Sequence, residues 1–428
     1  MNRPNILMMS AHDIGRTLGC YGIAEVETPS IDRLAADGIR LTRFHSVAPQ
    51  CSPSRAAFAT GLYPHAVGVI GICSEVFGFD LTRPDLHIAN VLGRAGYHTA
   101  GVGVAHESLH PERLFDSFDP THDADGIVSA AGNAIDRLSS GEGPFYIQVG
   151  FQQAHRPFVD GDASGPGIYV PPWLDDDPEV RGELAAFQGS IARLDEAVGA
   201  LLGALERSGC AERTIVCFVA DHGIPFPRAK HTLYEPGCEA AALFRLPGRW
   251  AGGRTVDAPL SGVDLAPTLL EACGTSSDAE VHGRNFVRLL DGEVEPEERL
   301  VFTEQNYHAY LDCSRSVRDC RHKLIANFSP GRGFFDSSQS WRPKATPKGF
   351  TNAARTYHPS LELYDLHRDS LEHTNLADAP EHREVLTRLS QSLASWMRHT
   401  EDPLMHGIPM PPIYERTMRA LGFEPPRN

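Results

Sequence analysis

The segment CSPSR, residues 51–55, places a cysteine, a proline and an arginine within about one helical turn. Pro53 suits the first turn of a helix and Gly61 suits its end, so we expect a short helix that begins near Cys51. The free N–H groups and the dipole of a helix amino terminus favour an anion, and Arg55 adds a fixed positive charge. The spacing therefore predicts an anion site at Cys51, against the alternative of a buried structural cysteine.

Histidine and aspartate residues follow four segments that have the apolar composition of buried strands. They are His12 and Asp13 after the strand at 5–10, His106 after the strand at 101–105, His155 after the strand at 144–151, and Asp221 and His222 after the strand at 214–220. Ligands of open parallel sheets bind beyond the carboxyl ends of the strands. Each residue alone has a structural explanation, but four such strands together indicate a functional site.

Two adjacent pairs, His12-Asp13 and Asp221-His222, form a reasonable ligand set for one divalent metal ion. Carboxylates alone suit calcium or magnesium, whereas added imidazoles shift the preference toward manganese, iron or zinc. For His12, a histidine that only packs at the strand end is the alternative. The sequence therefore predicts a metal site whose ion is left open.

The other polar candidates indicate chemistry on a tetrahedral anion. Arg55 and Lys230 supply fixed positive charge, and His106 and His155 can exchange protons near neutral pH. Such a set of groups would hold an anion and its charged transition state. A bare thiol at Cys51 is, however, a poor nucleophile for a sulfate or phosphate ester beside a hard metal ion.

The elements that must position these residues alternate between strands and helices. Residues 28–38 predict a helix capped by Thr28 and ended by Gly38. A longer helix is expected over 183–207, where apolar residues recur every three or four positions at Phe187, Ile191, Leu194, Val198, Leu201 and Leu205. This alternation predicts an α/β fold in which helices cover both faces of a large, mostly parallel sheet.

The pattern changes near residue 295. The segments 315–328 and 362–377 predict short strands of a small antiparallel sheet, and a helix is expected over 381–397. The proline-rich end of the chain is expected to lie along the surface or against a second subunit, as in a homodimer. The expected units are a catalytic domain at 1–295, a smaller C-terminal subdomain at 296–400 and a tail at 401–428.

Composition narrows the class of protein further. The chain has 428 residues, 41% of them hydrophobic, and a net charge of −16. Such a negative field disfavours binding to nucleic acid. No apolar run is long enough to cross a membrane, and the first residues lack the pattern of a secretory signal, so a cytoplasmic location is expected. The nine scattered cysteines favour reduced thiols over a disulfide framework.

CSPSR has the C-x-P-S-R form of the type I sulfatases, and six more blocks follow the order of that family. The seven blocks are PNILMMSAHD, CSPSRAAFATG, GYHTAGVGVAH, HRPF, FVADHGIPFPRAKHTLYEPG, VDLAPTLL and ELYDLHRDSLEHTNLA. The chain therefore resembles this family over essentially its whole length, and is most similar to its heparan N-sulfatase (sulfamidase)-like branch. The resemblance implies an alkaline-phosphatase-like α/β fold and hydrolysis of a sulfate ester or sulfamate, on a sugar.

The resemblance also implies how Cys51 is used. In this family, a formylglycine-generating or other sulfatase-modifying enzyme oxidises the cysteine to formylglycine. One hydroxyl of the hydrated aldehyde attacks sulfur, and the second allows sulfate to be eliminated. The ion is calcium by family, and its implied ligands here are His12, Asp13, Cys51, Asp221 and His222.

By position, four other residues take on family roles. Arg55 resembles the arginine that holds the hydrated aldehyde, and Lys230 resembles the lysine that contacts sulfate. His155 resembles the histidine near the leaving group, which we take as the general acid. His106 resembles the histidine that supports the diol. A departing amine needs a proton more than a phenolate does, so His155 matters most for an N-sulfate.

This sequence departs from the family pattern at three positions. His12 and His222 replace an aspartate and an asparagine, and an Asp-His second pair is similar to that of the manganese-dependent phosphonate monoester and phosphodiester hydrolases. Val104 stands where sulfatases have a lysine, whose loss would cost on the order of 3 kcal/mol of transition-state stabilisation. Two alternatives follow: a phosphonate monoester or phosphodiester hydrolase, and an inactive homologue that only binds a sulfated ligand.

Three further residues are candidates for contact with the substrate. Arg16 and His65 are the cations that would substitute for the missing lysine, and a surface or capping role is the alternative for both. His231 would shape the wall of the pocket, or only pack the loop after Lys230.

Overall fold

A computed structural model describes residues 3–161, 165–250, 252–276, 279–293, 299–308, 310–331 and 357–424. Its larger part is an eight-stranded sheet in which β8 alone is antiparallel to its neighbours. In spatial order the strands are β5 (Ser117–Asp119), β4 (His98–Gly103), β6 (Phe145–Gly150), β1 (Asn5–Ala11), β7 (Thr214–Ala220), β8 (Ala242–Arg245), β2 (Ile39–Leu41) and β9 (Arg254–Val256). A separate pair joins β3 (Phe44–His45) to β10 (Leu260–Ser261).

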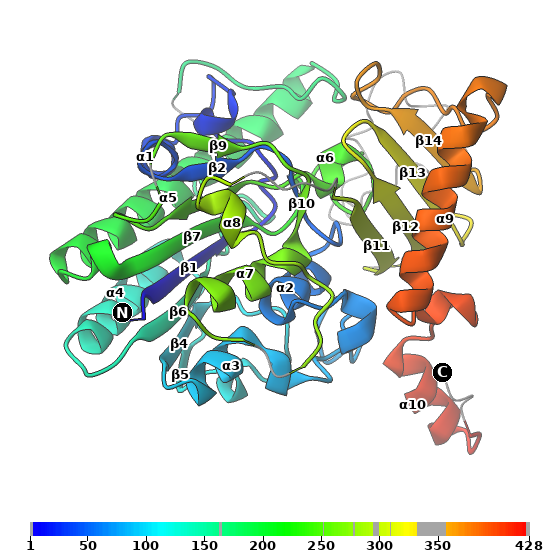
Figure 1. Cartoon of the computed structure of the whole chain (residues 1–428). Coiled ribbons are helices and arrows are strands. Elements are labelled where there is room, and N and C mark those ends of the chain that lie inside the picture. Colours follow the sequence, from blue (N-terminus) through cyan, green and yellow to red (C-terminus); the bar gives the residue numbers. More distant parts are fainter. Residues whose placement is uncertain are drawn as a thin grey trace.

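Helices cover both faces of this sheet, as Figure 1 shows. One layer contains α1 (Pro29–Asp37), α4 (Ala124–Ser139) and α5 (Pro178–Arg207); the other contains α2 (Cys51–Thr60), α3 (Ile88–Arg94), α7 (Leu265–Ala272) and α8 (Val287–Leu290). The central strands β1, β6 and β7 are buried along their whole length, as expected for strands covered on both sides. The predicted α/β architecture, with helices on both faces of a large, mostly parallel sheet, is thus confirmed.

The smaller part is a four-stranded antiparallel sheet, which also agrees with the sequence. Its strands, in order, are β11 (Val301–Tyr307), β12 (Leu311–Arg318), β13 (His322–Asn327) and β14 (Leu361–Asp365). The helix α9 (Arg383–His399) packs on β12 and β13. The strand register places Val317 opposite Leu324, and both join Leu389 and Trp396 in one apolar cluster. The short helix α6 (Glu235–Cys238) lies on the side of the larger part that faces this sheet (Figure 1).

Three local expectations need correction. α5 begins at Pro178, five residues before the predicted start, because Asp177 caps it by accepting from the N–H groups of Glu179 and Val180. Thr28 precedes α1 but makes no capping bond; its hydroxyl accepts from the Gly19 N–H instead. The proline-rich tail includes the helix α10 (Pro412–Ala420), for which the sequence analysis predicted no helix.

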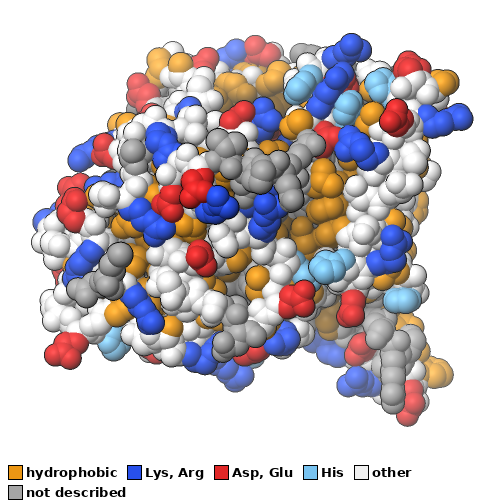
Figure 2. Space-filling model, in the orientation of Figure 1, with side chains coloured by type: hydrophobic (Ala, Val, Ile, Leu, Met, Phe, Trp, Pro, Cys, Tyr) orange, Lys and Arg blue, Asp and Glu red, His pale blue; other side chains and the backbone are white. Residues whose placement is uncertain are grey.

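Among the described residues, no helix combines the length and the apolar character that crossing a bilayer requires. Figure 2 shows acidic and basic side chains interspersed over one face, with apolar side chains visible in a hollow beside α9. A cleft of about 530 Å³ lies there, between α9 and the larger part, and its wall includes Tyr63, Phe302 and Trp396.

Candidate active site

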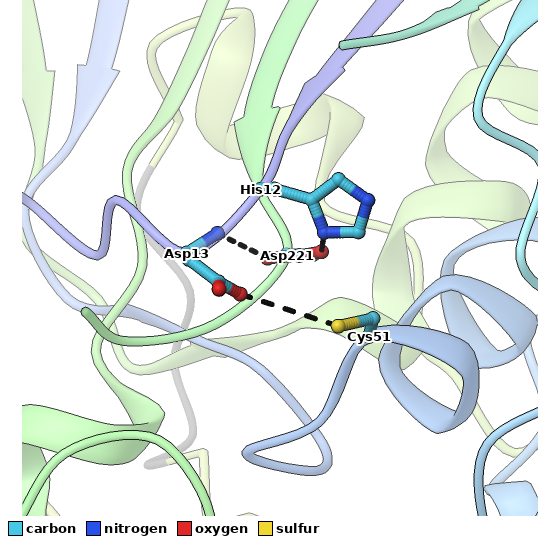
Figure 3. A group of neighbouring side chains, drawn as sticks. All are labelled: His12, Asp13, Cys51 and Asp221. Carbon is cyan, nitrogen blue, oxygen red and sulfur yellow. Dashed lines mark hydrogen bonds and ion pairs between the residues drawn. The ribbon is translucent and has the colours of Figure 1, made fainter. Parts of the chain in front are cut away.

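The residues predicted at strand ends come together at one edge of the large sheet. The strands β4, β6, β1 and β7 are consecutive and parallel, so their carboxyl ends lie side by side. The ring of His12, after β1, has its centroid 5.2 Å from that of His106 and 5.1 Å from that of His155. Figure 3 shows His12, Asp13 and Asp221 grouped with Cys51, which α2 presents at its first residue.

Two buried carboxylates form the centre of the site. Asp221 accepts from the backbone N–H of Asp13 at 2.9 Å, and its Oδ2 lies 3.0 Å from Nδ1 of His12. Lys230 donates its ammonium to both oxygens of Asp13, at 2.9 and 2.8 Å. Burial opposes the charge of Asp13, but the surrounding positive charge, that of Lys230 first, together outweighs burial and holds the pKa of this carboxyl at about 2. The pKa of Asp221 likewise lies well below its ordinary value, against burial, because of neighbouring His222, His12 and Arg55. Both carboxylates are therefore ionised at neutral pH.

His222 shows why a cation belongs here. Its Nδ1 lies 2.9 Å from the carbonyl oxygen of Gly223, so Nδ1 carries the proton and Nε2 has a free lone pair. Burial lowers the pKa of His222, which keeps the ring neutral. That Nε2 lies 3.1 Å from Oδ1 of Asp13, a contact between two acceptors that only a positive charge would make favourable.

The residues present fit a divalent metal ion. Ligand atoms of His12, Asp13, Cys51 and Asp221 all lie within 4.8 Å of one another, and His222 Nε2 adjoins them at 3.6 Å from Asp221. In addition, Nε2 of His12 is buried and has no hydrogen-bond partner among the described residues. A ligand set of carboxylates and imidazoles suits manganese, iron or zinc better than it suits calcium, which prefers oxygen ligands alone.

Cys51 is buried at the foot of α2, with 2% of its surface exposed. Its Sγ lies 3.4 Å from Nε2 of His222 and 4.0 Å from Oδ1 of Asp13. Burial raises the pKa of the thiol to about 12, even though Lys230 acts to lower it. The unmodified thiol is therefore protonated at neutral pH, which is its less nucleophilic form.

Arg55 lies one turn further along α2 and reaches the same centre. Its Nε donates to Oδ2 of Asp221 at 3.1 Å, and its Nη1 donates to the hydroxyl of Ser10 at 2.8 Å. Nη1 also approaches the carbonyl oxygen of Val104 at 3.4 Å. Nη2 is buried and has no partner within the described ranges. This arginine is thus fixed at two nitrogens and leaves the third for a ligand.

The two proton-exchanging histidines flank His12. His155 places Nδ1 2.7 Å from the carbonyl oxygen of Arg156, so Nδ1 donates and Nε2 is free to exchange a proton. His106 keeps a buried Nδ1 that no described residue contacts by a hydrogen bond. Burial lowers the pKa of both rings, and that of His106 falls to about 4.

The structure separates the three remaining candidates. Arg16 forms an ion pair with Glu239 and donates to the Thr42 carbonyl. His65 binds Glu304 through Nδ1 and lies 3.1 Å from the Thr400 carbonyl through Nε2. Both side chains are thus already paired within the protein. His231, in contrast, adjoins Lys230 in the chain and contacts Gln50, the neighbour of Cys51.

Sequence reasoning missed several features of the site. Ser10 and Gln50 hold Arg55 and His231 in place, and neither stands out in the sequence. Asp13, at φ 54°, and His231, at φ 67°, both adopt a left-handed backbone that is strained for residues other than glycine. The only available signal for Gln50 was its place next to CSPSR.

Comparison with known proteins gives the class and then the family. The Sulfatase family model matches residues 4–129 and 127–275, and the model "N-sulphoglucosamine sulphohydrolase, C-terminal" matches residues 226–339. The chain belongs to the sulfatase family, whose members hydrolyse sulfate esters or sulfamates, as the resemblance implied. It is similar to human N-sulphoglucosamine sulphohydrolase, with 29% identity over 93% of this chain and 91% of the relative. It is also 30% identical to human arylsulfatase A over 87% of this chain and 83% of the relative.

Solved structures agree on the fold. One is a protein in complex with its substrate D-glucosamine-2-N,6-O-disulfate, with a TM-score of 0.75, 18% identity, and coverage of 94% of this chain and 99% of that one. Another is the phosphonate monoester hydrolase of Agrobacterium radiobacter, with a TM-score of 0.72, 20% identity, and coverage of 93% and 96%. At these identities the likeness concerns the fold alone.

Proposed function

We propose that this sulfatase-family enzyme hydrolyses a sulfate ester or sulfamate on a sugar, using formylglycine made from Cys51 and one divalent metal ion. The similarity to human N-sulphoglucosamine sulphohydrolase over nearly the whole chain supports a sugar substrate. The observation that carries the proposal is the setting of Cys51. A side chain at a helix amino terminus, beside two carboxylates and between Arg55 and Lys230, is placed to meet an anion.

Formylglycine would supply a hydrated aldehyde at position 51, which is the nucleophile that a buried, protonated thiol does not provide. Arg55 would bind an oxygen of the transferred group through its free Nη2. Lys230 would neutralise the same group, since its ammonium is already held toward the centre by Asp13. Both cations act where negative charge develops, which is the most effective place for them.

His155 is the residue we propose for protonating the leaving group. Its Nδ1 is fixed by a backbone carbonyl, so one tautomer is imposed and Nε2 carries the lone pair; the ring centroid lies 5.1 Å from that of His12. His106, on the other side of His12, would orient the group at position 51. The nitrogen of a sulfamate and the alkoxide oxygen of a sugar sulfate are both strongly basic, and hence poor leaving groups, so proton delivery is needed for either substrate.

The metal ion would be held by Asp13, Asp221 and His222, with His12 as a fourth ligand. It would supply Lewis-acid stabilisation of charge on the transferred group. The two imidazoles favour manganese or another transition metal, whereas the family favours calcium. The identity of the bound metal ion is therefore left to measurement.

A second candidate is hydrolysis of a phosphonate monoester or phosphodiester. Two observations favour it: the Asp221-His222 pair, and Val104 in place of a lysine, with its carbonyl turned to Arg55. With one cation fewer around the transferred group, the site departs from the sulfatase pattern at the position that stabilises the transition state.

One preparation tests both candidates. Peptide mass spectrometry first establishes whether residue 51 is formylglycine, and metal content is measured on the same sample. Turnover of N-sulfated glucosamine, a sugar O-sulfate, 4-nitrophenyl sulfate and a phosphodiester is then compared, with Cys51→Ala as the control. We expect a sulfated substrate to have the highest kcat/KM and Cys51→Ala to lose at least about 10⁴-fold. A phosphodiester that exceeds all sulfated substrates by orders of magnitude would overturn the first proposal in favour of the second.

A further inference from the structure

The antiparallel sheet of the C-terminal part sends one side chain into the catalytic region. His308 directly follows β11 and is half-buried. Its ring centroid is 5.6 Å from that of His231, in an edge-to-face arrangement. Burial, and then the positive charge of Lys230, lower the pKa of His308 well below its ordinary value, so the ring is neutral. A residue more than 250 positions from Cys51 thus borders the site.

His231 is held so that one ring nitrogen has a defined role. Its backbone N–H donates to the Pro49 carbonyl at 2.9 Å, and its Nδ1 accepts from the Gln50 side-chain amide at 2.8 Å. Because Nδ1 is an acceptor, the proton of the neutral ring is on Nε2. That Nε2–H is buried and makes no hydrogen bond within the described part of the chain. The left-handed backbone at this residue, φ 67°, is the strain that accompanies this placement.

His308 also has a buried ring nitrogen, Nδ1, without a hydrogen-bond partner among the described residues. Buried polar atoms are nearly always paired, and leaving one unpaired costs free energy. Two such atoms on touching rings, next to Lys230, are therefore placed for a ligand rather than for the fold.

We propose that His231 and His308 form a wall of the active site that recognises uncharged hydroxyl groups of the sugar beside the transferred sulfate. This inference rests on the proposed function and names the part of the substrate that these two residues contact. Neutral imidazoles donate and accept single hydrogen bonds, which suits hydroxyl groups. A second sulfate or a carboxylate at this wall would call for arginine or lysine. In this arrangement, Arg55 and Lys230 bind the transferred anion, and the two histidines of the wall bind the sugar.

The test compares a sugar substrate with one that lacks hydroxyl groups. Enzyme with formylglycine at residue 51 is assayed with N-sulfated glucosamine and with 4-nitrophenyl sulfate. For both His308→Ala and His231→Ala, we expect the ratio of kcat/KM for the sugar to kcat/KM for the aryl sulfate to fall at least tenfold, mainly through a higher KM for the sugar. His367→Ala, an exposed histidine of the same C-terminal part, is the matched control and should leave the ratio unchanged.

A conservative variant protects the test from loss of folding. His308→Gln keeps a polar side chain and should recover part of the ratio that His308→Ala loses. Thermal unfolding and metal content are measured for each variant. A ratio that stays at the wild-type value in folded His308→Ala and His231→Ala, while the wild type hydrolyses the sulfated sugar, would overturn this inference alone. A wild type with formylglycine that hydrolyses neither sulfated compound would overturn the proposed function and the inference together.

Discussion

Two buried arginines, Arg55 in the large α/β part and Arg315 in the C-terminal sheet, differ in how completely they are paired. Arg315 binds Asp402 through Nε at 2.6 Å and through Nη2 at 2.9 Å. Its Nη1 donates to Asn306 and to two backbone carbonyls. Arg55 also has a carboxylate partner, Asp221, but its Nη2 is left without one among the described residues. Every guanidinium nitrogen of Arg315 therefore has a partner within the fold, whereas Nη2 of Arg55 has none among the described residues.

Two buried histidines show the same contrast. Both nitrogens of His65 face acceptors, the Glu304 carboxylate and the Thr400 carbonyl, which is the pairing of a charged imidazolium. His12 has Asp221 on one nitrogen and no described partner on the other. Burial lowers the pKa of His12 well below its ordinary value, so its free nitrogen is a lone pair. Saturated pairing marks a structural cluster, and unsaturated pairing at equal burial marks a site that awaits a ligand.

Arg315→Met should produce the largest loss of stability. The variant leaves the Asp402 carboxylate buried beside an apolar side chain, and breaking a buried ion pair in this way costs about 3–5 kcal/mol. We expect a lower midpoint of thermal unfolding, together with a kcat/KM per folded molecule close to that of the wild type. Calorimetry and active-site-normalised kinetics measure the two quantities.

The double variant Arg315→Met/Asp402→Asn is the control for this reasoning. Removing the unpaired charge should restore part of the lost stability, because the penalty comes from the isolated carboxylate. A double variant less stable than Arg315→Met would mean that packing, and not charge, dominates this cluster.

Much of the fold and of the centre of the site is predictable from the sequence, for a simple geometric reason. Parallel strands side by side must bring their carboxyl ends to one edge, so the positions of His12, Asp13 and Asp221 follow once the strands are recognised. The helix at Cys51 follows from local signals, and Gly61 does end it in a left-handed conformation, at φ 71°.

The rest of the site depends on contacts that sequence patterns do not encode. Arg16 and His65 are both candidate cations in the sequence, and only the tertiary structure reveals their partners Glu239 and Glu304. His308 reaches the site through the register of a sheet formed after residue 295. The left-handed conformation of Asp13 likewise has no local signal, because surrounding contacts impose it.

Arg55→Met tests whether the partly paired arginine contributes to activity more than to stability. Because Nη2 is free for a ligand, we expect kcat/KM for the preferred sulfated substrate to fall about 10²–10³-fold. Stability should fall less than in Arg315→Met, since Asp221 keeps His12 and the Asp13 N–H as partners. Arg55→Lys, which retains charge but has a single donor nitrogen, should recover only part of the activity. An Arg55→Met enzyme with wild-type kcat/KM but strongly reduced stability would make the two arginines alike and refute the distinction.

The smallest expected effect concerns the pH dependence of stability at His65. Burial opposes its charged form, but the adjacent Glu304 outweighs burial and raises the pKa of His65 above 6.5. A pKa raised in the folded state adds stability that is fully present below about pH 6.5 and is lost as the pH rises through the folded-state pKa. His65→Gln removes this contribution, so the gap in unfolding midpoint between wild type and variant should narrow as the pH is raised from 6 to 9. A gap that stays constant or widens over this range would show that His65 is neutral in the folded protein, and that its pairing does not differ in kind from that of His12.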